Sequence, residues 1–502
     1  MTWHHPDLTD TQATILLIVL GLFVTFAISE GVRRSNYAKG VTSLKEPAMW
    51  FVGTLLAVIW FLLLLFSTVK LIETLLVDDP GELRWISLLF LGLTGAPFVI
   101  WRSVVAQAQS DTASQGMITD RINKAVEGLG AEKTVKRPVR GADGTTTYEE
   151  ATEPNLEVRV GAVLSLERIA KNSPDDHIQI MEILCAYIRE NACIVNIGTD
   201  GDPNWQQRVD TQTAITVIGR RAPSAIAGEE ARGPAYRLDL RHSNLQCTDM
   251  SQGRFGSALF QGTLLGKSNL ARANLREAKL WDANLKGAQL GGANLQEAEL
   301  SYAKLQGAEL EYANLQEAQL GLAKLQGAGL WGANLQGAEL RSANLQGAEL
   351  EDANLQGAGL WGANLQEAQF RGANLQGAWL GYANLQGAEL SEANLQGAEL
   401  GYANLQGAYL VGANLVSTDL RRCRMDHTRL RSVDFTEDTK IDAESLTAAF
   451  GVKSGIGLCK LDGDYPAHWH VAADVDEDGP EHQYAYNIAY DAWVAKNPLP
   501  KE

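Results

Sequence analysis

Hydrophobic residues recur at every fifth position from Leu240 to Phe435, which gives forty consecutive apolar positions. The residue two positions earlier is small almost everywhere, and the typical unit reads A-N-L-Q-G or A-E-L-x-x. In an α-helix a step of five residues rotates by about 140°, so the leucines would not share a face. In a continuous β-strand the same step alternates between the two faces. A chain that turns once per pentad buries all of these residues together, and this is the structure that the pattern predicts.

Within each A-N-L triplet the side chains would alternate in, out and in, as they do on a short strand. The next two residues would then form a corner. Leucine fills the interior of such a coil, and alanine fits beside it because only a small side chain has room. Coils stacked at the inter-strand spacing of about 4.8 Å bond only to their neighbours. We therefore expect a β-solenoid over residues 236–435.

Three hydrophobic stretches without Asp, Glu, Lys or Arg occupy about residues 11–29, 47–69 and 85–101. A membrane-spanning helix needs about 20 apolar residues, with about 17 as the lower edge. The pattern predicts three transmembrane helices in residues 1–102, although a buried helix of a soluble domain is an alternative for the third. The loop 30–46 is basic and the loop 70–84 is acidic, which places everything after Arg102 in the cytoplasm. Because the stretches lack charged residues, anchoring is a simpler interpretation than transport.

Residues 103–235 have the pattern of a small cytoplasmic α-helical domain. Apolar residues follow helical spacing over 156–171 and again after Ser173, which is expected to cap the second helix. A third helix is expected near 209–221, and the polar segment 138–154 is expected to be a flexible insert. Residues 436–502 are expected to form a C-terminal cap and tail, with short helices at 442–450 and 485–496.

The composition limits the functions that the chain is expected to have. The net charge of −17 disfavours direct binding to nucleic acid, and 45% apolar residues exclude bulk disorder. Five scattered cysteines fit a reducing compartment. His177 and Cys185 are interpreted as structural, and the histidines of the tail match no metal motif. Because no nucleophile–base pair, phosphate loop or metal cluster stands out, we expect no enzyme activity, no cofactor and no metal.

The long tandem of A(N/E)L-x-x units resembles the pentapeptide-repeat family. The likeness extends to LEVRVGAVLSLERIAKNSPDDHIQIMEILCAYIREN (156–191), VDTQTAITVIGRR (209–221) and YPAHWH (465–470), which are similar to membrane-anchored bacterial members. The resemblance implies a right-handed quadrilateral β-helix with four pentads, or 20 residues, in each coil. It brings no catalytic or cofactor-binding residues. The expected fold class is thus multi-domain: transmembrane helices, a small α-helical domain, and a β-helix with a C-terminal cap.

A 20-residue coil arranges the outward side chains into columns. Asparagines would stack on two opposite faces, where side-chain amides can form ladders. One corner would carry an aromatic stripe that is a candidate protein-binding surface: Trp281, Tyr302, Trp361, Tyr382 and Tyr402. Self-stacking that stabilises the corner is the alternative interpretation. Glutamates on the remaining faces form a candidate acidic face: Glu299, Glu309, Glu339, Glu349, Glu389 and Glu399. The alternative there is that charge of one sign keeps the rod soluble.

The sequence thus predicts a non-enzymatic protein-interaction scaffold, tethered to the bacterial inner membrane by several spans, with its repeat domain in the cytoplasm. The alternative is an acidic rod that mimics DNA and binds a DNA-binding protein such as a topoisomerase. The identity of the partner and the oligomeric state are left open.

Overall fold

The computed structural model describes residues 58–70, 72, 80–140, 146–194, 206–233, 236–430, 433, 438–442 and 449–451. The chain divides into two compact units, Met1–Thr119 and Asp120–Glu502. The predicted span 11–29 and the predicted helix 485–496 lie outside the described residues, as does the first part of the span 47–69.

In the first unit, residues 58–70 are helical, and helix α3 (Pro80–Leu129) begins there and continues into the second unit. The predicted span 85–101 falls within α3. Among the helices of the described residues, none is both long and apolar enough to cross a membrane. The helix at 58–70 nevertheless exposes large apolar side chains, including Leu62 at 55% and Phe66 at 56%.

A β-hairpin follows α3. Strand β1 (Glu132–Arg140) pairs antiparallel with β2 (Thr146–Pro154), in a register from Glu132↔Pro154 to Arg140↔Thr146. Arg137 pairs with Glu153 and Lys136 with Glu150 across the strands. This differs from the flexible insert expected over 138–154. The hairpin escapes pattern recognition because most of its side chains are exposed, so neither strand alternates polar with apolar residues.

Helices α4 (Leu156–Asn172), α5 (His177–Asn191), α6 (Val209–Gly219) and α7 (Pro223–Glu230) form the predicted helical domain. Its core contains Leu166, Ile180 and Ile215, which are fully buried. Helix α5 begins at His177, so the prediction that Ser173 caps it was wrong. The Ser173 hydroxyl instead donates a hydrogen bond of 2.5 Å to the Asp176 carboxylate, within the turn that precedes the helix.

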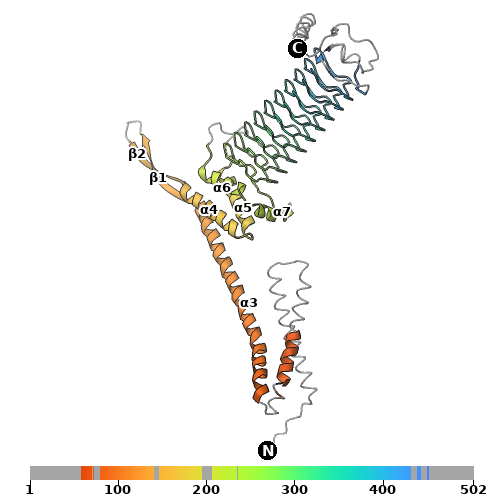
Figure 1. Ribbon diagram of the computed structural model, residues 1–502. Helices are drawn as coiled ribbons and strands as arrows, with labels where there is room; N and C mark the ends of the chain where they lie inside the picture. The colour runs from red at the N-terminus through yellow and green to blue at the C-terminus, as the bar shows by residue number, and fades with distance from the viewer. Residues whose placement is uncertain are drawn as a thin grey trace, which may run out of the picture. The chain divides into compact units, whose positions relative to one another are not determined.

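The solenoid confirms the central prediction (Figure 1). From Asp239 to Tyr409, each residue at the middle of a pentad forms a parallel bridge with the residue 20 positions later, as Asn294 does with Asn314. Every fifth residue from Leu240 to Leu430 is at most 3% exposed. Burial of these side chains, together with hydrogen bonds to the coils on either side, holds the stack together.

Each corner is a β-turn closed by a bond between the backbones of the leucine and the following alanine, such as Ala298 N to Leu295 O at 3.0 Å. The residue before that alanine has a positive φ, as in a type II turn. Glycine suits this position, and Gly357 adopts a φ of +65°. Other residues adopt it too, including Glu317 at +56° and Tyr382 at +60°. This conformation costs about 1–2 kcal/mol for a residue with a Cβ, and the coil enforces it.

The helical domain covers the first coil. The side-chain amide of Gln212 on α6 donates to Asp249 O (2.8 Å) and accepts from Asp249 N (3.0 Å). Arg254 N donates to Gly219 O, at the end of α6, at 2.9 Å. These bonds satisfy backbone groups that an open solenoid edge would otherwise present to another chain.

The five-residue period breaks near the C-terminal end. Asp419 pairs with Lys440, which is 21 residues later, and Leu420 N donates to Lys440 O at 2.7 Å. One extra residue therefore enters the last coil. Beyond it, β3 (Arg429–Leu430) pairs parallel with β4 (Phe450–Gly451). Phe450 thus lies in a strand and not at the end of the helix predicted for 442–450, while Phe435 lies outside the described residues.

Candidate functional site

The outer surface of the rod has four faces, each formed by one column of mid-pentad residues spaced 20 apart. Face 1 runs through Glu299 and Trp379, and face 3, on the opposite side, runs through Glu309 and Glu389. Faces 2 and 4 are the asparagine faces. The corner between face 1 and face 2 carries the predicted aromatic stripe and is called the aromatic corner.

The asparagine faces are structural, as expected. On face 4 each amide donates to the one in the coil before it, from Asn414 down to Asn294, at 3.1–3.3 Å. Each Asn side chain also accepts from the backbone N two residues on, as Asn354 does from Gln356 at 3.2 Å. On face 2 the same ladder joins Asn404 to Asn344. These side-chain amides are therefore hydrogen-bonded to one another and to the backbone N–H groups of the corners.

The structure brings the residues of the aromatic corner together. The rings of Trp361 and Tyr382 lie 5.4 Å apart, and those of Tyr382 and Tyr402 stack at 4.8 Å with an angle of 3°. The Arg341 guanidinium lies 4.7 Å from the Trp361 ring, and that of Arg422 lies 5.2 Å from Tyr402. Five side chains from five successive coils thus form one continuous row.

The other predicted members, Trp281 and Tyr302, meet edge to face at 5.9 Å. Leu322 lies between the two groups on the same corner and is 47% exposed. The five predicted aromatic residues are 44–55% exposed. The corner therefore has both properties that the sequence suggested: the rings stack on one another, and they remain open to a partner.

Three further exposed aromatic residues lie outside the column for which the sequence predicts an aromatic stripe. Tyr312 and Trp331 meet edge to face at 4.8 Å on the corner between faces 3 and 4. Trp379 stands at the centre of face 1 and is 58% exposed. Applying the 20-residue period to every column would have found all three.

The six predicted glutamates lie on the two faces that carry no asparagine ladder, as expected. Glu299, Glu339 and Glu399 lie on face 1, and Glu309, Glu349 and Glu389 lie on face 3. Gln319, Gly359 and Trp379 separate those of face 1. Glu299 also pairs with Lys279. Among the described residues, none of the other five makes an ion pair.

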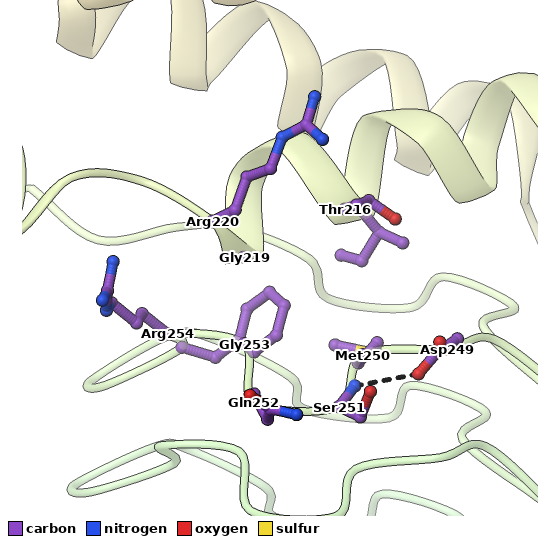
Figure 2. Close-up of a pocket in the computed structure, with 11 residues that line it drawn as sticks. Thr216, Gly219, Arg220, Asp249, Met250, Ser251, Gln252, Gly253 and Arg254 are labelled. Atoms are coloured by element: carbon purple, nitrogen blue, oxygen red, sulfur yellow. Dashed lines mark hydrogen bonds between the residues drawn. The ribbon is translucent and has the colours of Figure 1, made fainter.

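A cavity opens where α6 meets the first coil (Figure 2), lined by Thr216, Arg220, Asp249, Ser251 and Arg254 among others. Its two cations are already engaged. Arg220 forms two hydrogen bonds with Glu167 on α4, at 2.6 and 2.8 Å, and Arg254 donates to the backbone O of Arg221. Both arginines are therefore held by contacts within the protein, and the Asp249 carboxylate accepts a hydrogen bond from Ser251 N at 3.1 Å.

The helical domain also contains buried ionisable groups. Glu229 on α7 contacts His177 at 2.7 Å and Arg221 at 3.1 Å. Burial raises the pKa of the nearby Cys185 thiol to about 12, so it is not a nucleophile at neutral pH. No cluster of metal-ligating side chains occurs within the described residues. These groups join α5, α6 and α7 to one another.

A family model for pentapeptide repeats matches the chain in eight copies, over residues 254–292, 288–332, 333–368, 368–401 and 398–436. HetL, a pentapeptide-repeat protein involved in heterocyst differentiation regulation in the cyanobacterium Nostoc sp. strain PCC 7120, is 35% identical. The alignment covers 42% of this chain and 97% of HetL, with a TM-score of 0.21. The chain belongs to the pentapeptide-repeat proteins.

Two further solved structures have lower sequence identity to this chain. QnrB1, a plasmid-mediated fluoroquinolone resistance protein, is 19% identical, over 33% of this chain and 92% of its own, with a TM-score of 0.28. A pentapeptide-repeat protein from the thylakoid lumen of Arabidopsis thaliana is 28% identical, over 27% of this chain and 78% of its own, with a TM-score of 0.10. No protein of curated function matches the chain.

Proposed function

We propose that this pentapeptide-repeat protein is a non-enzymatic scaffold, tethered to the inner membrane of a bacterium, that binds a protein partner along its aromatic corner. The observation that carries the proposal is the continuous row from Arg341 to Arg422, in which the aromatic rings are 44–55% exposed. Trp, Tyr and Arg are the residues that contribute most to binding at protein interfaces. A rigid row of them loses little side-chain entropy when a partner binds.

Membrane tethering is proposed from the apolar stretches of the N-terminal region. Residues 47–69 contain no Asp, Glu, Lys or Arg, and Leu62 and Phe66 are more than half exposed. Apolar groups gathered on a surface in this way are stable in lipid and costly in water. The test is extraction of bacterial membranes with alkaline carbonate. The proposal requires the full chain to stay with the pellet, and its release into the supernatant would contradict tethering.

Partner binding is tested with the full chain carrying Trp361→Ser and Tyr382→Ser, by capture from a bacterial lysate. The matched control carries Trp331→Ser and Tyr312→Ser, which removes a Trp–Tyr contact from the opposite corner. We expect the first variant to lose the captured protein and the control to retain it. The stability of both variants is measured by urea unfolding. A loss of stability with unchanged capture would show that the aromatic corner is structural.

The DNA-mimic function remains a second candidate because residues 281–420 contain fifteen acidic and five basic side chains. This stretch is seven coils, or about 34 Å, and a DNA duplex of that length carries about 20 negative charges. The net charge of the rod is thus half that of the duplex. Salt-sensitive recovery of a topoisomerase that does not depend on Trp361 and Tyr382 would favour mimicry over the scaffold.

A further inference from the structure

Trp379 is an exception among the exposed aromatic residues of the described coils. Each of the others contacts a second ring or an arginine: Trp281, Tyr302, Tyr312, Trp331, Trp361, Tyr382 and Tyr402. Trp379 is the most exposed tryptophan of these coils, at 58%, and no ring or cation of the described residues covers it. An exposed indole of this kind is a candidate contact for a partner.

The backbone holds Trp379 rigidly at the centre of face 1. Its N donates to Ala358 O at 2.9 Å, and its O accepts from Leu360 N at 2.8 Å. The neighbouring position on one side is Gly359 and on the other is Glu399. These bonds fix the backbone position of Trp379, and the glycine at the neighbouring position leaves space beside the indole.

Carboxylates flank the indole along the same column. The Glu339 carboxylate lies over Gly359, since an oxygen of it would stand 2.7 Å from a Cβ at that position. Glu399 occupies the next position of the column after Trp379, one coil further along the rod. Neither glutamate makes an ion pair with the described residues. Face 1 therefore presents an open aromatic ring between two uncompensated negative charges.

This arrangement fits a guanidinium group. Arginine stacks on aromatic faces and pairs with carboxylates, and the rod already uses the first contact at Arg341 on Trp361, at 4.7 Å. The carboxylates repel phosphate, which disfavours nucleic acid and anionic lipid as occupants of face 1. The occupant that the charges complement is a basic segment of a protein.

The spacing of the two glutamates indicates how far apart the basic residues of the segment should be. The backbones of Glu339 and Glu399 are three coils apart, which is about 14 Å at the stacking distance of ~4.8 Å. An extended peptide rises about 3.4 Å per residue, so residues i and i+4 are about 14 Å apart and lie on the same side. Two arginines with three residues between them would reach both carboxylates.

We infer that face 1 from Glu339 to Glu399 binds an extended basic segment of a protein partner, with arginines at i and i+4. One guanidinium pairs with Glu399 and stacks on Trp379, and the other pairs with Glu339. The inference rests on the proposed scaffold function and specifies the chemistry of the partner. The segment lies along face 1, beside the aromatic corner, where Trp361 contacts the neighbouring Gly381.

The test uses the purified full chain and a synthetic extended peptide, Val-Arg-Val-Thr-Val-Arg-Val. The control peptide replaces both arginines with citrulline, which keeps the shape and removes the charge. We expect saturable binding of the arginine peptide in calorimetry, at least tenfold weaker binding of the citrulline peptide, and weakening as salt rises. Equal binding of the two peptides would overturn the inference, as would no binding of either.

Single substitutions in the full chain test whether the peptide binds at face 1. Trp379→Ala is expected to weaken peptide binding about five- to thirtyfold, and Glu399→Gln to weaken it and reduce its salt dependence. Trp331→Ala is the matched control, because it removes an exposed indole from another corner, and should change binding less than twofold. Glutamine occurs naturally in this column at Gln319, so Glu399→Gln preserves the coil. Circular dichroism verifies folding.

Three results would overturn the inference: unchanged peptide binding by Trp379→Ala, an equal loss with Trp331→Ala, or competition by duplex DNA or anionic vesicles at the same site. Lysate capture by the chain that carries Trp361→Ser and Tyr382→Ser tests the scaffold function separately. Its result distinguishes an error in the peptide-binding inference from an error in the proposed function. If capture still depends on the aromatic corner while Trp379→Ala does not change peptide binding, the proposed scaffold function is retained. The inference that face 1 binds a basic segment is then wrong. If capture depends on neither, both proposals fail.

Discussion

Replacing one interior leucine tests the architecture on which every other conclusion depends. Leu335 is fully buried, and its coil is fixed on both sides by backbone bonds: Leu335 N donates to Asn354 O at 2.7 Å, and Asn334 N donates to Ala313 O at 2.9 Å. In Leu335→Ala the neighbouring coils cannot close over the space left behind without breaking these bonds.

The cost follows from the atoms removed. Three carbons at about 0.8 kcal/mol each give ~2.4 kcal/mol of lost transfer free energy. A cavity that cannot collapse adds to this, within a range of about 2–5 kcal/mol for Leu→Ala. We expect the free energy of unfolding to fall by about 3–4 kcal/mol. Gln336→Ala, at the half-buried corner position beside it, should change stability by less than about 0.5 kcal/mol.

Urea unfolding of the full chain, followed by circular dichroism, measures both variants. Hydrogen exchange then tests whether the damage is local, because a solenoid couples each coil only to its neighbours. Amides near Leu335 should exchange faster, while those of the first coil stay protected. A loss below about 1 kcal/mol, or one equal to that of the control, would refute an interior packed with leucine.

Three further predictions follow from particular contacts. Lys324→Asn should raise stability by about 1–2 kcal/mol in urea unfolding, because the new amide can accept from Asn344 and from the backbone two residues on; no gain would contradict the structural role of the ladder. Native protein treated with iodoacetamide should be alkylated at Cys247, which is exposed, and not at Cys185, which is buried; mass spectrometry reads the result, and equal labelling would contradict the packing of α5. Burial works to raise the pKa of Asp210, but the Tyr187 hydroxyl and the Arg208 guanidinium hold it below the usual value. Its contribution to stability is therefore present above about pH 4 and is lost as pH falls through the lowered pKa, so the stability gap between wild type and Asp210→Asn should close on acidification; a gap independent of pH would refute this.

The repeat architecture follows from the amino-acid sequence alone. A five-residue period of large apolar residues is incompatible with a helix or a flat strand, so one corner per pentad was the only arrangement that buries Leu240 to Leu430 together. The 20-residue coil, first implied by the family resemblance, then fixed which side chains share a column. The aromatic corner followed from that spacing and needed no further information.

Features that the five-residue period does not encode depend on packing in three dimensions. Whether two stacked rings meet, as Tyr382 and Tyr402 do, depends on side-chain rotamers. The same is true of the isolation of Trp379, which is defined by contacts that are missing among the described residues. The hairpin at 132–154 and the extra residue before Lys440 break the local patterns, and pairing across the chain is what stabilises them. A sequence period predicts backbone geometry because burial repeats with it, whereas individual contacts depend on which side chains happen to be neighbours in space.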